Sequence, residues 1–116
     1  MNGVTATELE LLTFFEMVPK LRDQDVPWMY NDALYEVRQA DLTLSFAVAP
    51  GYKDMRLMLK RAGHTLYEMN ALGIEDIKYH NDSGREALEI VITSQDRLIV
   101  RLTPQISVLH EVREHV

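Results

Sequence analysis

Four short segments of alternating apolar and polar residues, each bounded by turn residues, fill positions 77–112 and constrain the fold more than any other part of the chain. Such alternation is typical of a strand with one buried face. A slip of one residue would turn a whole apolar set toward water, so the register that keeps these sets together is strongly favoured. The stretch therefore predicts a four-strand antiparallel meander. The alternating apolar residues of its last three strands are Leu88, Ile90 and Ile92, then Leu98, Val100 and Leu102, then Ile106 and Val108.

The turns predict how these strands pair. Glycine in Ser83–Gly84 supplies the positive φ of a two-residue hairpin turn, which places Tyr79 opposite Leu88. A three-residue loop in the next hairpin would place Ile90 opposite Val100. These registers are expectations that the structure can test residue by residue.

The face opposite the core carries an unexpected apolar row. In the predicted register Asp76, Val91, Ile99 and Leu109 lie side by side, and three of them are aliphatic on a face expected to meet water. Scattered surface aliphatics are common in soluble proteins. The alternative is that Val91, Ile99 and Leu109 bind a protein partner or a second copy of the chain.

An apolar segment at 26–30 holds Trp28, the single tryptophan of the chain. It falls within a connector, residues 20–32, that is rich in turn-forming residues. Tryptophan in a loop is typical of an interface anchor, so Trp28 joins the candidate partner-binding residues. The alternative is a lid over one end of the core.

Two helices are expected. Thr5 and Glu8 fit a capping box that opens a helix ending near Val18, just before a proline. A second helix is expected over residues 53–72, where methionine, leucine and alanine form an apolar stripe and Gly73 provides a stop.

The complete prediction is an α+β fold of order α-β-β-α-β-β-β-β, with an antiparallel sheet of five to six strands and both helices packed on one face. Its first hairpin is formed by residues 33–38 and 42–48. Residues 110–116 are expected to form a polar tail. Because the chain has 116 residues and no composition break, we expect one domain over residues 1–116.

Composition narrows the class of protein. A formal net charge of −6 disfavours broad binding to nucleic acid or to anionic membranes. The chain has no cysteine, no apolar run long enough to span a bilayer and no signal-peptide pattern at its start. We therefore expect a soluble, cytoplasmic protein.

No motif indicates a catalytic residue, a metal site or a cofactor. The serines lie outside nucleophile-elbow contexts, and the turn at residues 82–85 lacks a phosphate-loop pattern. A basic stripe on the second expected helix is a possible anion site, although a solvated helix face has the same composition. Its residues are Lys53, Arg56, Lys60 and Arg61.

These observations favour a non-enzymatic, self-associating protein-binding module, such as a small acidic adaptor, an inhibitor or a chaperone-like protein. The partner would be another protein or a second copy of the chain. The alternative is a small-molecule binding protein, possibly for a haem-like ligand, or an enzyme, with a cavity between a curved sheet and the helices. Candidate lining residues of that cavity are Tyr35, Phe46, Tyr79 and His80.

Overall fold

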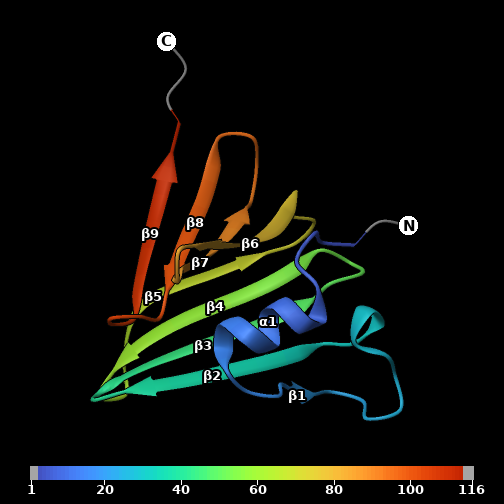
Figure 1. The fold of residues 1–116 in the computed structure, drawn as a ribbon, viewed down its shortest axis with the longest axis horizontal. Helices are drawn as coiled ribbons and strands as arrows, with labels where there is room; N and C mark the ends of the chain where they lie inside the picture. Colours follow the sequence, from blue (N-terminus) through green and yellow to red (C-terminus); the bar gives the residue numbers. More distant parts are fainter. Residues whose placement is uncertain (1–2, 114–116) are drawn as a thin grey trace.

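The computed structural model describes residues 3–113, and its regular structure is almost entirely β (Figure 1). The described part contains one α-helix, α1, and one short 3-10 helix, η1. In chain order the elements are α1 (Glu8–Phe15), β1 (Lys20–Leu21), η1 (Trp28–Tyr30), β2 (Ala33–Gln39), β3 (Leu42–Ala49), β4 (Asp54–Arg61), β5 (His64–Ala71), β6 (Asp76–Asp82), β7 (Arg85–Val91), β8 (Asp96–Arg101) and β9 (Ser107–Val112).

The strands form two antiparallel sheets, a five-stranded sheet of order β1-β2-β3-β4-β5 and a four-stranded sheet of order β6-β7-β8-β9. The predicted α+β fold with two helices on one sheet is therefore wrong. The first predicted hairpin is present as β2–β3, but residues 53–72 form the hairpin β4–β5 in place of the second helix. The predicted tail is also wrong for residues 110–112, which belong to β9, while residues 114–116 lie outside the described part.

Apolar residues on both faces of the β4–β5 hairpin explain the mistaken helix. Met55 and Leu57 are buried in the core, while Met58 is half-buried on the opposite face. Met55 and Met58 lie on opposite faces of the strand, but their spacing of three residues would place them on one face of a helix. Ala62 and Gly63, with φ of 49° and 83°, form the tight turn that joins the two strands.

The core of the first sheet is built from cross-strand rows. Tyr35, Phe46, Leu57 and Met69 are aligned on β2, β3, β4 and β5. Tyr35, Phe46 and Leu57 are almost completely buried. Phe15 of α1 stacks on Tyr35, with ring centroids 4.5 Å apart, and lies 5.7 Å from the Phe46 ring. The helix therefore covers this face of the first sheet, as Figure 1 shows.

Helix α1 also touches the second sheet. The ring of Phe14 meets Tyr79 of β6 edge to face, with centroids 6.3 Å apart. The capping box is formed by Thr7 and Glu10, two residues later than predicted, and the helix ends early because Glu16 adopts a left-handed conformation with φ of 54°. Helix α1 thus has two neighbours, one on each sheet.

The second sheet confirms the predicted meander but shifts one register. Tyr79 lies opposite Leu88, as predicted. Ile90 lies opposite Leu98 instead of Val100, because the loop between β7 and β8 is longer than expected. A shift of two residues leaves every side chain on its predicted face, but it changes which residues are neighbours.

Side chains and backbone groups far apart in the sequence join the two sheets. The Gln39 amide donates to the Leu102 carbonyl at 2.6 Å, and its oxygen accepts from the Ile106 amide at 2.7 Å. The Ala6 amide donates to the Ile77 carbonyl at 2.8 Å. One buried apolar cluster includes residues of α1 and of both sheets. Within residues 3–113, no helix has the length and apolar character needed to cross a membrane.

Candidate functional site

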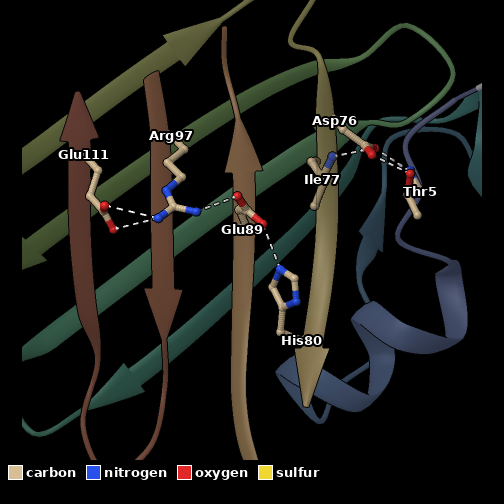
Figure 2. A network of polar contacts seen from close by, with 7 residues as sticks. All are labelled: Thr5, Asp76, Ile77, His80, Glu89, Arg97 and Glu111. Atoms are coloured by element: carbon tan, nitrogen blue, oxygen red, sulfur yellow. Dashed lines mark hydrogen bonds and ion pairs between the residues drawn. The ribbon is translucent and has the colours of Figure 1, made fainter. Parts of the chain in front are cut away.

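A network of polar contacts, called the outer-face network below, crosses the outer face of the second sheet (Figure 2). Glu89 on β7 lies at its centre, with one carboxylate oxygen 2.8 Å from His80 Nε2 and the other accepting from Arg97 Nη1 at 3.0 Å. Arg97 Nη2 donates to Glu111 at 3.2 Å. Each of the four strands thus contributes one member.

Contacts within the outer-face network shift the pKa values of Glu89 and Arg97 toward their charged forms. Burial alone would raise the pKa of Glu89, but hydrogen bonds from His80 and Arg97 outweigh it and lower that pKa below its usual value. Hydrogen bonds to Glu89 and Glu111 raise the pKa of Arg97. The result is a half-exposed guanidinium held in one orientation by two carboxylates.

The predicted partner-binding residues lie next to the outer-face network, but Val91 is not in the same cross-strand row as Ile99 and Leu109. Val91 is opposite Arg97, whereas Ile99 lies between Glu89 and Leu109. Val91 and Ile99 are half-buried, and Leu109 is 54% exposed. The exposed apolar surface here is therefore centred on Leu109. A polar hollow of about 520 Å³ at this face is lined by Glu89, Val91, Arg97 and Glu111, among others.

The outer face of the first sheet has a larger hollow, of about 670 Å³. It lies between the segment 22–32 and the paired strands β4 and β5. A smaller hollow of about 290 Å³ adjoins it and shares Arg56 and Asn70 with it. The larger one, called the outer hollow below, is lined by Arg22, Asp23, Val26, Tyr30, Asn31, Asp32, Ala49, Tyr52, Asp54, Met55, Arg56, Asn70, Ala71 and Leu72.

Asp32 occupies an unusual position in the wall of the outer hollow. Its Oδ2 accepts a hydrogen bond of 2.8 Å from Arg56. Its Oδ1 is buried and has no hydrogen-bond partner among the described residues. A buried carboxylate oxygen without a donor is costly, so Asp32 is the polar group here whose hydrogen bonding is least complete.

The rim of this hollow is held by Asn31, one of the turn-forming residues of the connector. Its side chain is buried and donates to the Asp23 and Val26 carbonyls, the latter at 2.8 Å. Its oxygen accepts from the Asp32 and Asp23 amides at 2.9 and 3.2 Å. The connector is thus a fixed loop. Asparagine among turn formers was the signal available in the sequence.

Trp28 anchors the same loop from inside. It is buried, and its indole nitrogen donates to the Tyr35 hydroxyl at 3.1 Å. Burial raises the pKa of Tyr35 to about 12. Trp28 therefore packs as a lid over the core, and its ring is not exposed to a partner.

Of the four residues predicted to line a ligand cavity, Tyr35 and Phe46 lie side by side, whereas Tyr79 and His80 lie on the second sheet. Tyr35 and Phe46 are covered by Phe15. Tyr79 is half-buried on the inner face and donates to Glu86 at 2.5 Å, whereas His80 lies on the outer face beside Glu89. None of the four lines any of the three hollows described above.

The four residues of the predicted basic stripe do not form one basic surface. Arg56 reaches Asp32, and Arg61 lies 3.7 Å from Asp41. The Lys53 ammonium, in the turn before β4, donates to the Glu75 carbonyl at 3.3 Å. Lys60 is half-buried on β4. Strand geometry separates side chains that helix geometry would have aligned.

A tyrosine, a histidine and an aspartate meet where β5 approaches β9. His110 Nδ1 lies 3.5 Å from the Tyr67 hydroxyl, and His110 Nε2 lies 2.8 Å from Asp96 Oδ1. Burial, reinforced by the Asp96 charge, raises the pKa of Tyr67, so the phenol stays protonated. Neither Tyr67 nor His110 lines a described hollow. In residues 3–113, no three His, Cys, Asp or Glu side chains gather to hold a metal ion.

Comparison with known proteins establishes the fold class. No protein-family model matches the chain, and no curated protein sequence matches it. A chain of the solved structure described as "Contact-dependent growth inhibition toxin - immunity protein complex from Klebsiella pneumoniae 342" has the same fold, with a TM-score of 0.77. The likeness covers 96% of this chain and 98% of that chain at 19% sequence identity. At this identity the two chains share a fold.

Proposed function

We propose that the protein is an inhibitor of the immunity type, which neutralises a toxin by binding it. The observation that carries this proposal is the fold likeness to a chain of a toxin–immunity complex over almost the full length of both chains. An adaptor or a chaperone would also bind protein without catalysis, but neither is suggested by that likeness.

Between the two partners of such a complex, the inhibitor suits this chain better. Its polar clusters are internally paired, as Glu89 is with Arg97 and His110 is with Asp96. An inhibitor needs only a complementary surface. The net charge of −6 favours a partner with a basic surface.

Growth protection tests the proposal. An inhibitor must be made together with the toxin it neutralises, so the candidate toxins are those encoded beside its gene. Each would be expressed in bacterial cells with and without this protein, and the toxin of the Klebsiella pneumoniae 342 complex would serve as a non-cognate control. We expect relief of growth arrest for a neighbouring toxin only. If no neighbouring toxin is neutralised, the proposal is wrong.

Self-association through the outer face of the second sheet is a second candidate. Leu109 is exposed on β9, an edge strand whose outer side pairs with no other strand in the described part of the chain. It lies opposite Ile99 and would give a second copy an apolar contact. The small-molecule alternative has less support because Phe15 fills the space between α1 and the first sheet.

A further inference from the structure

We infer that the outer hollow of the first sheet is where the toxin docks, and that a basic loop of the toxin inserts an arginine or lysine side chain into it. This inference rests on the proposed function and adds to it a surface and a chemistry of recognition.

The rim of the outer hollow has the composition of an interface. Tyr30 is 59% exposed, Tyr52 is 63% exposed and Leu72 is 85% exposed, and all three border the same hollow. Tyrosine is enriched at protein interfaces because it combines a large apolar area with a polar tip and few rotamers to immobilise. Two tyrosines and a leucine around one concave site would enclose an inserted side chain and exclude water from it.

The hollow is lined by three carboxylates, Asp23, Asp32 and Asp54, against two guanidinium groups, Arg22 and Arg56, so a cation is the better fit. Within residues 3–113, neither Asp23 nor Asp54 takes part in an ion pair. Asp32 offers a carboxylate oxygen without a donor. The Arg56 side chain bound to Asp32 Oδ2 is 59% exposed, so an approaching side chain meets this ion pair from the solvent side. A guanidinium or ammonium group supplies the missing hydrogen bond and charge together.

The hollow is also formed in advance. Asn31 fixes the backbone of the 22–32 loop through its buried side chain, and Trp28 ties the loop to Tyr35 in the core. A rim that is already ordered loses little conformational entropy on binding.

The polar hollow on the second sheet is less suited to a basic partner. Three of its four carboxylates are already paired, Glu89 and Glu111 with Arg97 and Asp96 with His110. A basic side chain arriving there would have to displace Arg97 or lie beside it. The outer hollow of the first sheet is therefore the better site for a basic side chain of the toxin.

Binding of the cognate toxin, identified by growth protection, tests the inference. The affinity of the purified pair would be measured for wild type, Tyr52→Ala and Asp54→Asn. Asn at position 54 keeps the oxygen that accepts from the Gly73 amide, so the substitution removes charge and little else. We expect Kd to rise on the order of 30-fold for Tyr52→Ala, the size of an interface hot spot. Asp54→Asn should weaken binding and reduce its dependence on salt.

Matched changes on the second sheet provide the control. Leu109→Ala and Asp82→Asn alter an exposed aliphatic side chain and an exposed carboxylate away from the outer hollow, and both should leave the Kd for the toxin unchanged. Leu72→Ser, at a position that is 85% exposed, repeats the test if Tyr52→Ala disturbs folding.

The outcomes separate the two proposals. If the wild-type protein neutralises its toxin while the Tyr52, Asp54 and Leu72 variants bind as tightly as wild type, the docking surface is wrong and the function stands. A loss of affinity in Leu109→Ala would move the interface to the second sheet. If the wild-type protein neutralises no neighbouring toxin, the function and the docking surface both fail.

Discussion

The indole of Trp28 donates a buried hydrogen bond of 3.1 Å to the hydroxyl of Tyr35. Replacing Tyr35 with Phe would keep the packed ring but leave the indole N–H without an acceptor. We expect a loss of about 1–3 kcal/mol in the free energy of unfolding, measured by urea denaturation. Tyr30→Phe removes an exposed hydroxyl and should change that free energy by less than about 0.5 kcal/mol. Equal losses in the two variants would contradict the assigned role of this hydrogen bond.

Tyr35 also predicts how stability changes at high pH. Its pKa is raised from 10.0 to about 12 by burial, so the unfolded chain releases this proton first as pH rises. Ionisation of Tyr35 should leave the free energy of unfolding unchanged below pH 10 and should lower it between pH 10 and 12. The contribution is roughly 2–3 kcal/mol. Tyr35→Phe, compared with wild type across this range, should lack that part of the loss.

Glu89 predicts the behaviour in acid. Its pKa is lowered below 4.5 by His80 and Arg97, so its stabilising effect is present above pH 4.5 and is lost as pH falls below that value. Glu89→Gln should destabilise the protein at pH 7 by about 0.5–1 kcal/mol, and the difference from wild type should shrink in acid. Glu68→Gln, at an exposed position on β5, is the control. A difference that stays constant from pH 7 to pH 3 would argue against the linkage.

The β4–β5 turn can be improved. Ala62 has φ of 49°, a conformation that asparagine tolerates better than alanine. Ala62→Asn should therefore raise the free energy of unfolding by about 0.5–1 kcal/mol, whereas Gly63→Ala, at φ of 83°, should lower it by about 1 kcal/mol. Thermal melts would record both. Stabilisation by Gly63→Ala would mean that these residues do not form this turn.

Self-association is tested by Ile99→Glu, which places a charge in the half-buried contact beside Leu109. A dimer formed through this face should become a monomer, because a carboxylate would be desolvated at the interface. Light scattering gives the mass directly. Thr65→Glu, at an exposed position on β5 of the first sheet, should leave the mass unchanged. A monomer both before and after Ile99→Glu would rule out this surface for self-association.

The part of the fold that could be predicted from sequence is the part in which turn residues bound short segments with an apolar residue at every second position. In β7 and β8 these positions identified the strands and their inward faces, although Val91 and Ile99 are apolar on the outer face, and the turn at Gly84 set the register of the β6–β7 hairpin. The loop after Val91 left the next register two residues off. In β4, Met58 on the outer face made the pattern ambiguous between strand and helix, and sequence alone did not resolve it.

The candidate docking surface could not have been found from sequence. Asp32, Tyr52 and Leu72 are far apart in the chain and meet only because β3, β4 and β5 are paired and the 22–32 loop folds over them. In the sequence, the residue of the 22–32 loop that indicated an interface was Trp28, and its side chain is buried. Its functional interest lies in the polar residues that Trp28 and Asn31 hold in place.

The position of α1 between the sheets has a consequence for synthesis of the chain. Phe15 is covered only after Tyr35 and Phe46 are made, and Phe14 only after Tyr79. The helix is therefore made before the strands that cover it, and the ring of Phe14 lacks its partner on β6 until the whole first sheet has been translated. A chain with such distant contacts depends for its folding yield on keeping that helix from other nascent chains.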